Sequence, residues 1–379
     1  MIRPQFDLAD IVRRNLPDLK SSQSLSSEQA RALAAIGICR TAALGGHQYF
    51  CNDCGLVADQ SYNSCRNRNC PKCQALAQER WIQARACAIL PLPHFHVVFT
   101  LPEEFRALAR THPREIYDAL FKCVSAALLE MGWTRLGIKL GLTMVLHTWT
   151  RELLFHPHVH VLVSAGGLTN GGRVKRTKEN FLLPKQALSA LFKKKMLNAL
   201  RKIEKAGLLK MTEAAFGFLV ATLASQKWQV YLKKAFHTPA LVLAYLGRYT
   251  HRVGIANSRL LAVTADEVTF RSKDGRSVTV HPVVFLQRFV LHVLPDGLKK
   301  IRHAGLYASP KSLALAKADL GHLPVPVAQV ATWQEALLEL TGLDVTRCAA
   351  CRGMLFTSQI SPVRPPWFKP RDPTPRSLP

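Results

Sequence analysis

The sequence is short of acidic residues and has no long apolar run. It contains 25 Asp and Glu against 51 Lys and Arg, a formal charge of +26 over 379 residues. No charge-free stretch of about 18 apolar residues occurs, so a membrane-spanning helix is not expected. The N-terminus, MIRPQFDLADIVRR, lacks the apolar core of a signal peptide. We therefore expect a cytoplasmic protein, neither secreted nor embedded in a membrane.

The basic surplus is spread along the chain and predicts a polyanionic partner, with nucleic acid favoured over an anionic membrane surface or a purely solubilising role. Hydrophobic residues make up 48% of the chain, which is enough for packed cores. At about 100 to 200 residues per domain, two or three domains are expected. Nothing in the sequence sets the oligomeric state.

Apolar periodicity and turn residues divide the chain into elements. Residues 1–45 are predicted to be helical, and the proline-rich segment 358–379 is predicted to be disordered. The other predicted elements are strands at 94–101, 142–149, 159–164, 259–264, 267–271 and 277–280, and helices at 103–131, 186–206, 212–235 and 238–250.

Two C-x-x-C pairs stand close together near the N-terminus. Cys51 and Cys54 are separated from Cys70 and Cys73 by residues 55–69, a spacing typical of a four-cysteine zinc site. Cysteines in a reducing cytosol serve as metal ligands or buried thiols rather than as disulfides. Four thiolates around one ion form a closed, structural site, so we predict one structural Zn²⁺ held by these four residues.

Other possible ligands lie near this cluster or far from it. Cys65 and His47 are spare ligands that could replace one of the four cysteines. Cys348 and Cys351 form a further C-x-x-C, but no partner pair for it is visible in the sequence. A second metal site is therefore left open.

The segment between the cysteine pairs, Ser64-Cys65-Arg66-Asn67-Arg68-Asn69, is rich in cationic and amide side chains, and Lys72 follows. Such side chains on a rigid loop suit contacts to phosphates and base edges. Arg66, Arg68 and Lys72 are therefore predicted to bind DNA, and the alternative is a solvated loop.

A histidine pair lies at the start of the strand predicted at 159–164. His158 and His160 alternate with Val159, Val161 and Val163, so both imidazoles point to one face and the apolar side chains to the other. Two neutral imidazoles, completed by another side chain, water or substrate oxygen, suit a divalent cation that polarises a phosphate. On its own the H-x-H pattern is also found in ordinary strands.

A tyrosine pair follows at helical spacing. Tyr245 and Tyr249 stand four residues apart, on one helix face, and Arg248 and Arg252 each follow a tyrosine by three residues. A phenol with a pKa of about 10 needs nearby positive charge to act as a nucleophile at neutral pH. Two such nucleophiles could serve two successive strand transfers, and two core aromatics are the alternative.

These motifs resemble the HUH superfamily of rolling-circle nucleases, which carry a His-hydrophobic-His motif and a tyrosine nucleophile. More closely, the chain resembles the two-tyrosine transposases of the insertion-sequence-ninety-one family. The matching segments are SCRNRNCPKCQ at 64–74, VVFTLP at 97–102, FHPHVHVLVSAGGL at 155–168, YLGRYTHRVGIANSRL at 245–260 and FLQRFVLHVLPDGLKKIRHAGL at 285–306.

The resemblance implies an α+β protein with a ferredoxin-like HUH domain, an antiparallel sheet and flanking helices, preceded by a small helical and zinc-binding domain. The expected divisions are 1–90 for DNA recognition, 91–306 for catalysis and 307–379 for a C-terminal extension. It also implies rolling-circle transposition, in which Tyr245 and Tyr249 cleave single-stranded or hairpin DNA at element ends through a 5′-phosphotyrosine and a free 3′-hydroxyl.

Mg²⁺ or Mn²⁺ is expected at His158 and His160, because a phosphoryl substrate brings hard oxygen ligands. The third protein ligand is left open among His147, Glu152 and His156. We interpret His94 and His96 as ordinary strand histidines, and Trp149 and Trp228 as core residues rather than base-stacking platforms.

Two positions depart from the family pattern: Asn69 stands where His is usual, and Arg352 stands where a zinc knuckle would have Gly. Other functions also remain open. The chain could be an HUH replication initiator or relaxase with the same chemistry, or a zinc-dependent DNA-binding regulator without catalysis.

Overall fold

The structure is a computed structural model of the chain. It describes residues 5–73, 78, 81–85, 88–178, 182–236, 247, 254–272, 275–321 and 332–363. Tyr245, Arg248, Tyr249 and Arg252, together with most of the predicted helix 238–250, lie outside the described residues. No helix within these ranges is long and apolar enough to cross a membrane.

The largest unit is a twisted antiparallel sheet with the strand order β11-β4-β5-β3-β7. Four of these strands, β3, β4, β5 and β7, follow the chain order strand, helices, strand, strand, helices, strand. Their spatial order, β4-β5-β3-β7, is the ferredoxin-like arrangement. The predicted α+β class is confirmed. The strands are β3 (His94–Thr100), β4 (Lys139–Trp149), β5 (Phe155–Leu168), β7 (Val230–Phe236) and β11 (Ile301–Gly305), with β6 (Val174–Arg176) paired to β5.

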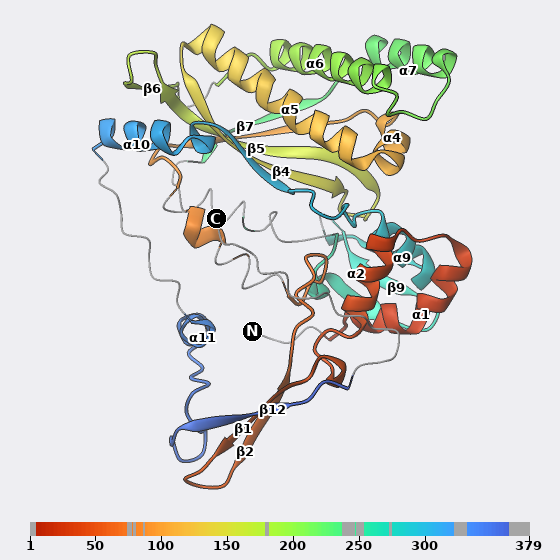
Figure 1. The fold of residues 1–379 in the computed structure, drawn as a ribbon, viewed down its shortest axis with the longest axis vertical. Helices are drawn as coiled ribbons and strands as arrows, with labels where there is room; N and C mark the ends of the chain where they lie inside the picture. Colours follow the sequence, from red (N-terminus) through yellow and green to blue (C-terminus); the bar gives the residue numbers. More distant parts are fainter. Residues whose placement is uncertain are drawn as a thin grey trace.

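One face of this sheet is covered by helices, as the upper layer of Figure 1 shows. Val159, Val161 and Val163 of β5 are fully buried there, in the main core, because every second residue of a strand points to the same side. The histidines of β5 consequently face the other side. The covering helices are α4 (Phe105–Thr111), α5 (Pro113–Met131), α6 (Lys185–Lys205) and α7 (Glu213–Ser225).

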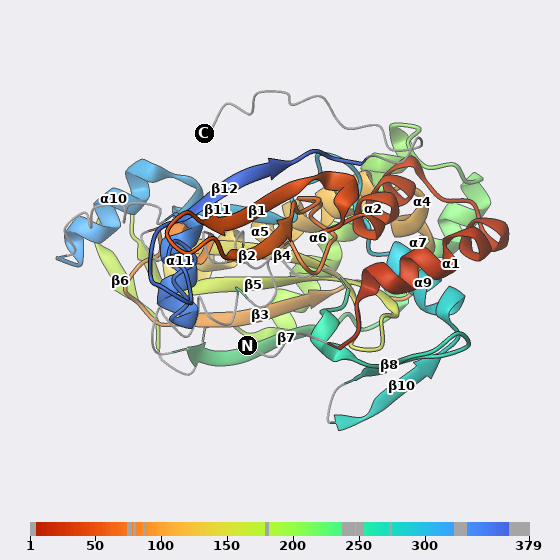
Figure 2. The same cartoon turned by 90° about the horizontal axis from the view of Figure 1, so that it is seen from below.

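A second core joins the start of the chain to a segment more than two hundred residues later. Helices α1 (Leu8–Ser22) and α2 (Ser27–Gly37) pack with α9 (Pro282–Val290), and Leu8, Ile11 and Phe285 are fully buried among them. Ser26 and Gln29 form a capping box at the start of α2. A small sheet of β8 (Leu260–Val263), β9 (Val268–Arg271) and β10 (Ser277–Val280) adjoins this core, and Figure 2 shows it beside α9.

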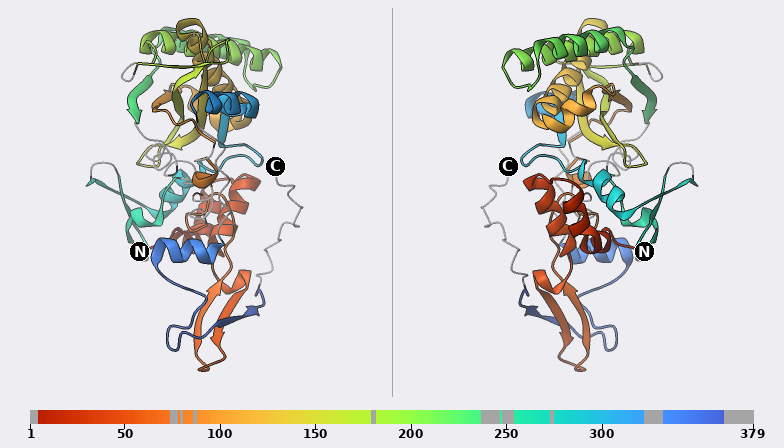
Figure 3. Two further views of the ribbon diagram at one scale, coloured as in Figure 1. Left: turned by 90° about the vertical axis from the view of Figure 1, so that its left-hand side faces the viewer. Right: turned by 90° about the vertical axis from the view of Figure 1, so that its right-hand side faces the viewer.

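A three-stranded ribbon lies at the end of the molecule opposite the helical layer (Figure 3). Its central strand β1 (Gly46–Cys51) pairs with β2 (Val57–Tyr62) on one side and with β12 (Leu355–Ile360) on the other. Residues 358–360, expected at the start of a disordered tail, therefore lie in a strand. Long-range pairing with β1 orders them, and no local pattern signals it.

A second correction concerns the predicted helix 212–235. In the structure α7 ends at Ser225, and residues Val230–Phe236 form strand β7, which pairs with β3. The remaining elements are α10 (Pro310–Asp319), α11 (Trp333–Thr341), the 3₁₀ turns Ala42–Leu44, Asn257–Arg259 and Leu306–Ala308, and a π-helical turn at Gly132–Leu136.

Candidate metal centres and nucleic-acid contacts

Three histidines meet on the sheet face opposite the helices. His158 and His160 are on β5, and His147 lies on the neighbouring strand β4, directly paired with His158. Paired residues of antiparallel strands point to the same face, so the three imidazoles share one side of the sheet. The structure thus selects His147 from the three candidates for a third ligand, while Glu152 is exposed in the turn after β4.

The separations of these imidazoles fit a common metal ion. Ligand nitrogens of His147, His158 and His160 all lie within 4.8 Å of one another. The Nε2 atoms of His158 and His160 are 3.1 Å apart, and the rings of His147 and His160 are 4.4 Å apart between centroids. Nitrogens about 2.1 Å from one ion fall in this range.

Hydrogen bonds fix how the two β5 imidazoles face this point. Nδ1 of His158 donates to the carbonyl oxygen of His156 at 2.6 Å, which leaves its Nε2 free to be a ligand. Nδ1 of His160 lies 2.8 Å from Nε2 of His96. His156 and His96 therefore orient the imidazoles of His158 and His160, although the sequence suggested only an ordinary strand role for His96.

Burial keeps the imidazoles neutral. It lowers the pKa of His158 to about 4, and it holds the pKa of His160 well below the usual range, with His158 and His96 adding to the effect. The pKa of His96 is also lowered to about 4 by burial and by Lys233. A metal ligand must be a neutral imidazole, so the site is prepared to bind a cation throughout the neutral range.

Lys300 and Trp149 lie at the edge of the histidine cluster. The Lys300 ammonium stands 4.8 Å from the centroid of the Trp149 ring, and the indole stacks on His147. The carbonyl of Lys300 accepts a hydrogen bond from Leu146, which holds the segment next to β4. Burial lowers the pKa of Lys300 to about 7, with a smaller contribution from Arg68.

Gly247, midway between the two predicted tyrosines, is the described residue of that segment. It is buried, and a β-carbon placed on it would lie 2.4 Å from Cδ1 of Ile82. Ile82 packs against a core cluster that contains Val145 and Leu162, which stand on the histidine face of β4 and β5. Gly247 thus adjoins the side of the sheet that carries the three histidines.

Eight of the cysteines that the structure describes form two clusters rather than the single predicted one. Cys70 and Cys73 meet Cys39 and Cys65, with all four sulfurs within 4.8 Å of one another. Cys73 Sγ lies 3.3 Å from Cys39 Sγ and 3.6 Å from Cys65 Sγ. Cys65, a reserve in the sequence prediction, is thus a full member, and Cys39 is a member that the sequence analysis missed.

Cys51 and Cys54 lie in the second cluster, with Cys348 and Cys351. The grouping of Cys51 and Cys54 with Cys70 and Cys73 is therefore corrected. The fifteen-residue spacing allowed that grouping, but β2 carries the chain away from the first pair before it reaches the second. His47 pairs with Ser61 in the ribbon and belongs to neither cluster.

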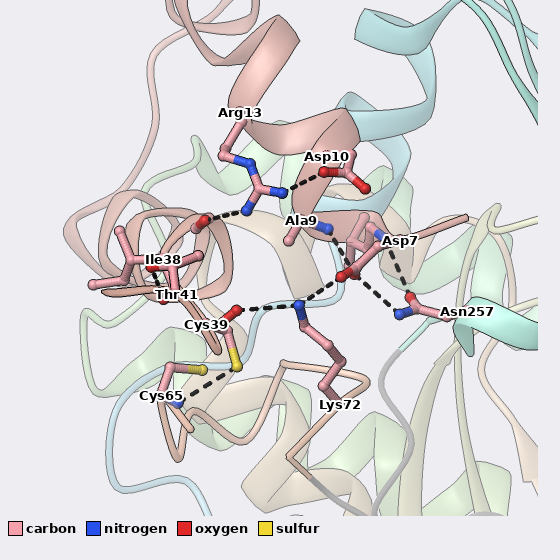
Figure 4. A network of polar contacts seen from close by, with 12 residues as sticks. Asp7, Ala9, Asp10, Arg13, Ile38, Cys39, Thr41, Cys65, Lys72 and Asn257 are labelled. Atoms are coloured by element: carbon pink, nitrogen blue, oxygen red, sulfur yellow. Dashed lines mark hydrogen bonds and ion pairs between the residues drawn. The ribbon is translucent and has the colours of Figure 1, made fainter. Parts of the chain in front are cut away.

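Two of the predicted DNA contacts have partners within the protein. The Arg68 guanidinium donates to the carbonyls of Leu294, Pro295 and Leu298, each at 2.8 Å. Lys72 forms an ion pair with Asp7 at 2.5 Å and donates to the carbonyl of Cys39, as Figure 4 shows. Their geometry favours a role in joining the cysteine loop to the rest of the fold.

Arg66 is exposed, unlike Arg68 and Lys72, and its φ of 52° lies in the left-handed region. Asn69 is buried, and its backbone N–H donates to the Asn67 side chain. His94 and Trp228 are buried, as interpreted from the sequence.

Comparison with known proteins places these features in a family. A "Transposase zinc-binding domain" profile matches residues 11–101, and a "Putative transposase" profile matches residues 141–313. "Putative transposase y4qJ" of Sinorhizobium fredii (strain NBRC 101917 / NGR234) is 38% identical, over 95% of this chain and 96% of its own. "Transposase for insertion sequence element IS801" of Pseudomonas savastanoi pv. phaseolicola is 30% identical, over 85% of this chain and 82% of its own.

The sheet, the histidine cluster and the zinc-binding N-terminal region together define a zinc-binding transposase. More narrowly, the chain belongs to the IS91, or insertion-sequence-ninety-one, family of transposases. Among solved structures, the N-terminal nuclease domain of the minute virus of mice non-structural protein 1 is 14% identical. That likeness covers 46% of this chain and 82% of that one, with a TM-score of 0.23.

Proposed function

We propose that this transposase cleaves and rejoins single-stranded DNA at the ends of a mobile element by rolling-circle transposition. A tyrosine forms a 5′-phosphotyrosine link and releases a 3′-hydroxyl. The observation that carries the proposal is the convergence of His147, His158 and His160 on one sheet face, the side of the sheet that Gly247 also adjoins through Ile82. The same motifs would serve a replication initiator, but the family is that of transposases.

The three imidazoles would hold a divalent cation. The three imidazoles lie close together. Hydrogen bonds orient those of His158 and His160, whose pKa values are lowered by burial. When bound, the cation would neutralise a non-bridging phosphate oxygen and stabilise the leaving oxygen. Three nitrogen ligands suit Mn²⁺ better than Mg²⁺, which prefers oxygen donors, so we expect Mn²⁺ to support the higher activity.

Tyr245 or Tyr249 supplies the nucleophile in this proposal. The phenolic oxygen loses its proton and attacks phosphorus, the bond from phosphorus to the 3′ oxygen breaks, and that oxygen takes up a proton to become the free hydroxyl. The second tyrosine can then attack at the other element end while the first still holds its strand. Rejoining is the reverse step, in which a 3′-hydroxyl displaces the tyrosine.

In this proposal Lys300 contacts the DNA backbone near this step. Its pKa of about 7 follows mainly from burial, and a phosphate beside it would favour the charged form. The ammonium faces Trp149, which stacks on His147. We therefore assign Lys300 to phosphate positioning, and Arg66, Arg248 and Arg252 to further DNA contacts.

Structural zinc belongs to the loop that precedes the catalytic domain. The sulfurs of Cys39, Cys65, Cys70 and Cys73 have tetrahedral-site separations, and the N–H of Cys65 points to Cys39 Sγ at 3.5 Å. We assign the zinc of the N-terminal domain to these four residues. The site would anchor the loop bearing Arg66 against α2, because Cys39 follows that helix directly.

The test uses a labelled single-stranded oligonucleotide that carries the element end, incubated with the full chain and Mn²⁺ or Mg²⁺. A covalent adduct on a denaturing gel is expected, lost in the Tyr245→Phe/Tyr249→Phe double variant and in His158→Ala. Tyr49→Phe, in the distant ribbon, is the matched control and keeps the adduct. Salt-sensitive binding without any adduct would instead indicate a DNA-binding regulator.

A further inference from the structure

We propose that Cys51, Cys54, Cys348 and Cys351 bind a second zinc ion, which fastens the C-terminal segment to the N-terminal ribbon. The matched zinc-binding domain ends at residue 101, so half of this site comes from outside it. The proposal does not depend on the nuclease function, because the ribbon and the histidine cluster share no residue.

The sulfur geometry is that of a tetrahedral site. Cys51 Sγ lies 3.5 Å from Cys351 Sγ, and Cys54 Sγ lies 3.7 Å from Cys348 Sγ. Four sulfurs at about 2.3 Å from a zinc ion are about 3.8 Å apart. A disulfide needs about 2.05 Å between sulfurs, so these contacts are not disulfides, and all four residues are free cysteines.

The two C-x-x-C loops have the same backbone hydrogen bonds. The carbonyl of Cys51 accepts from the N–H of Gly55 at 3.0 Å, and the carbonyl of Cys348 accepts from the N–H of Arg352 at 3.0 Å. In the other direction, the N–H of each first cysteine donates to the carbonyl five residues later, at 2.9 Å and 2.8 Å. Two segments about 300 residues apart in the chain thus form the same loop.

In both loops, the residue that follows the second cysteine has a left-handed backbone conformation. Gly55 has a φ of 71° and Arg352 a φ of 62°. Arginine adopts this conformation rarely, because its β-carbon crowds the following carbonyl. Arg352 thus has the left-handed backbone conformation of Gly55, although its residue type differs. A non-glycine residue in this conformation needs support from its surroundings.

The two loops also touch each other closely. A β-carbon on Gly353 would lie 1.9 Å from Oδ2 of Asp53, so the second loop approaches the Asp53 side chain of the first. The six paired positions from Gly46↔Ile360 to Cys51↔Leu355 set the register. This register brings both loops to the same end of the ribbon (Figure 1).

The ribbon has too little apolar core to hold β12 by burial alone. The side chains of β12 are exposed or only partly buried, with Phe356 43% exposed and Met354, just before the strand, 56% exposed. A small unit of this kind usually folds around a metal. Four thiolates in a tetrahedral arrangement select a soft or borderline ion, and Zn²⁺ is the common one.

The first experiment counts metal in the full-length chain by inductively coupled plasma mass spectrometry. Two zinc ions per chain are expected. Cys348→Ser/Cys351→Ser and Cys51→Ser/Cys54→Ser should each fall to one, and combining all four substitutions should still leave one. Cys123→Ser, a buried cysteine of the catalytic core outside both clusters, is the control and should keep two.

A single-site arrangement of Cys51, Cys54, Cys70 and Cys73 gives opposite results. It requires one zinc per chain in the unsubstituted protein and no loss in Cys348→Ser/Cys351→Ser, and either result would overturn the proposal. Iron in place of the second zinc would also overturn it.

If a serine double variant fails to fold, Cys351→His keeps a ligand at the site. Its Co²⁺ form should retain two metals and show a weaker sulfur-to-metal charge-transfer band than the unsubstituted protein. An unchanged spectrum would contradict the assignment of Cys351. Faster amide hydrogen exchange in residues 346–360 of the serine variants, with no change in β5, would place the effect in the ribbon.

Discussion

Nε2 of His96 lies 2.8 Å from Nδ1 of His160, with the two rings stacked 5.1 Å apart. When His160 binds a cation through Nε2, its Nδ1 carries the proton and donates it to His96. His96 is then a positioning residue that fixes the tautomer and the ring orientation of a ligand, as is common around metal sites.

The first prediction follows from this contact. His96→Ala should weaken Mn²⁺ binding by about 10- to 100-fold, the usual cost of losing such a partner, while maximal cleavage at saturating Mn²⁺ is largely retained. His96→Gln, which keeps an acceptor, should recover part of the affinity. Isothermal titration with Mn²⁺ measures both. Equal affinities in all three proteins would remove His96 from the site.

The second prediction concerns Gly247, which lies between Tyr245 and Tyr249 in the sequence. A methyl group on Gly247 would meet Ile82 at 2.4 Å, so Gly247→Ala should shift the segment and lower cleavage by at least about 10-fold, as small displacements of reacting groups do. Ile82→Val or Ile82→Ala in the same chain should restore activity by making room. The measurement is the rate of covalent adduct formation for each protein. A normal rate for Gly247→Ala would contradict the close contact between Gly247 and Ile82.

The third prediction is a loss of stability in mild acid. Burial lowers the pKa values of His94 and His292 to about 4, against about 6.5 in an unfolded chain. Above pH 6.5 both states hold neutral imidazoles and this stability is fully present. As the pH falls from about 6.5 to about 4, only the unfolded chain gains protons, so the free energy of unfolding decreases by up to about 1.4 kcal/mol per pH unit for each residue.

Urea midpoints at several pH values check this dependence against a matched variant. His292 hydrogen-bonds to Thr148 and to the carbonyl of Leu153, and His292→Gln can keep one of these contacts without titrating. The urea midpoint of His292→Gln should be lower than that of the unsubstituted protein at pH 7.5. It should fall less steeply between pH 7.5 and pH 5. Parallel curves for the two proteins would show that His292 does not contribute.

The fourth prediction separates two neighbouring arginines. Arg68→Ala removes the guanidinium that donates to three carbonyls of residues 294–298 and should lower the free energy of unfolding by about 2–3 kcal/mol. Arg66→Ala should change stability by less than about 0.5 kcal/mol, as exposed substitutions do, yet weaken binding to single-stranded DNA. Chemical unfolding and fluorescence anisotropy distinguish them, and equal stability losses would contradict the assignment.

The fifth prediction tests the left-handed turn after Cys351. Arg352→Gly removes a β-carbon from a position with a φ of 62° and should stabilise the ribbon by about 1 kcal/mol. Resistance of the second zinc to a chelator such as EDTA should rise accordingly. The reverse change, Gly55→Arg in the matching turn, should lower it. Faster zinc loss in Arg352→Gly would mean that the arginine side chain supports the turn.

The histidine face could be predicted because its signal is local. Alternation over a few residues of β5 is enough to place His158 and His160 together with the valines on the other side. His147 could be named only as a candidate, since the register of β4 against β5 is set by pairing that spacing does not encode. The same limit hid β7 (Val230–Phe236), because no local pattern records its pairing with β3.

The cysteine pairs show a different limit. Spacing rules compare residues near one another in sequence, and Cys51, Cys54, Cys70 and Cys73 satisfied such a rule. The observed partners are Cys39, which lies after α2 without a C-x-x-C of its own, and a pair about 300 residues away. Only the pairing of β1 with β12 brings that distant pair to the ribbon.

The pairing of β12 with β1 also sets an order of events during synthesis. The central strand of the ribbon leaves the ribosome among the first residues, but its second neighbour is made only after the histidine strand, the tyrosine segment and α11. Until residue 360 has emerged, one edge of β1 stays open and Cys51 and Cys54 lack their counterparts. A chain that ends before β12 therefore has an N-terminal ribbon with one unpaired strand edge and only two of its four cysteines.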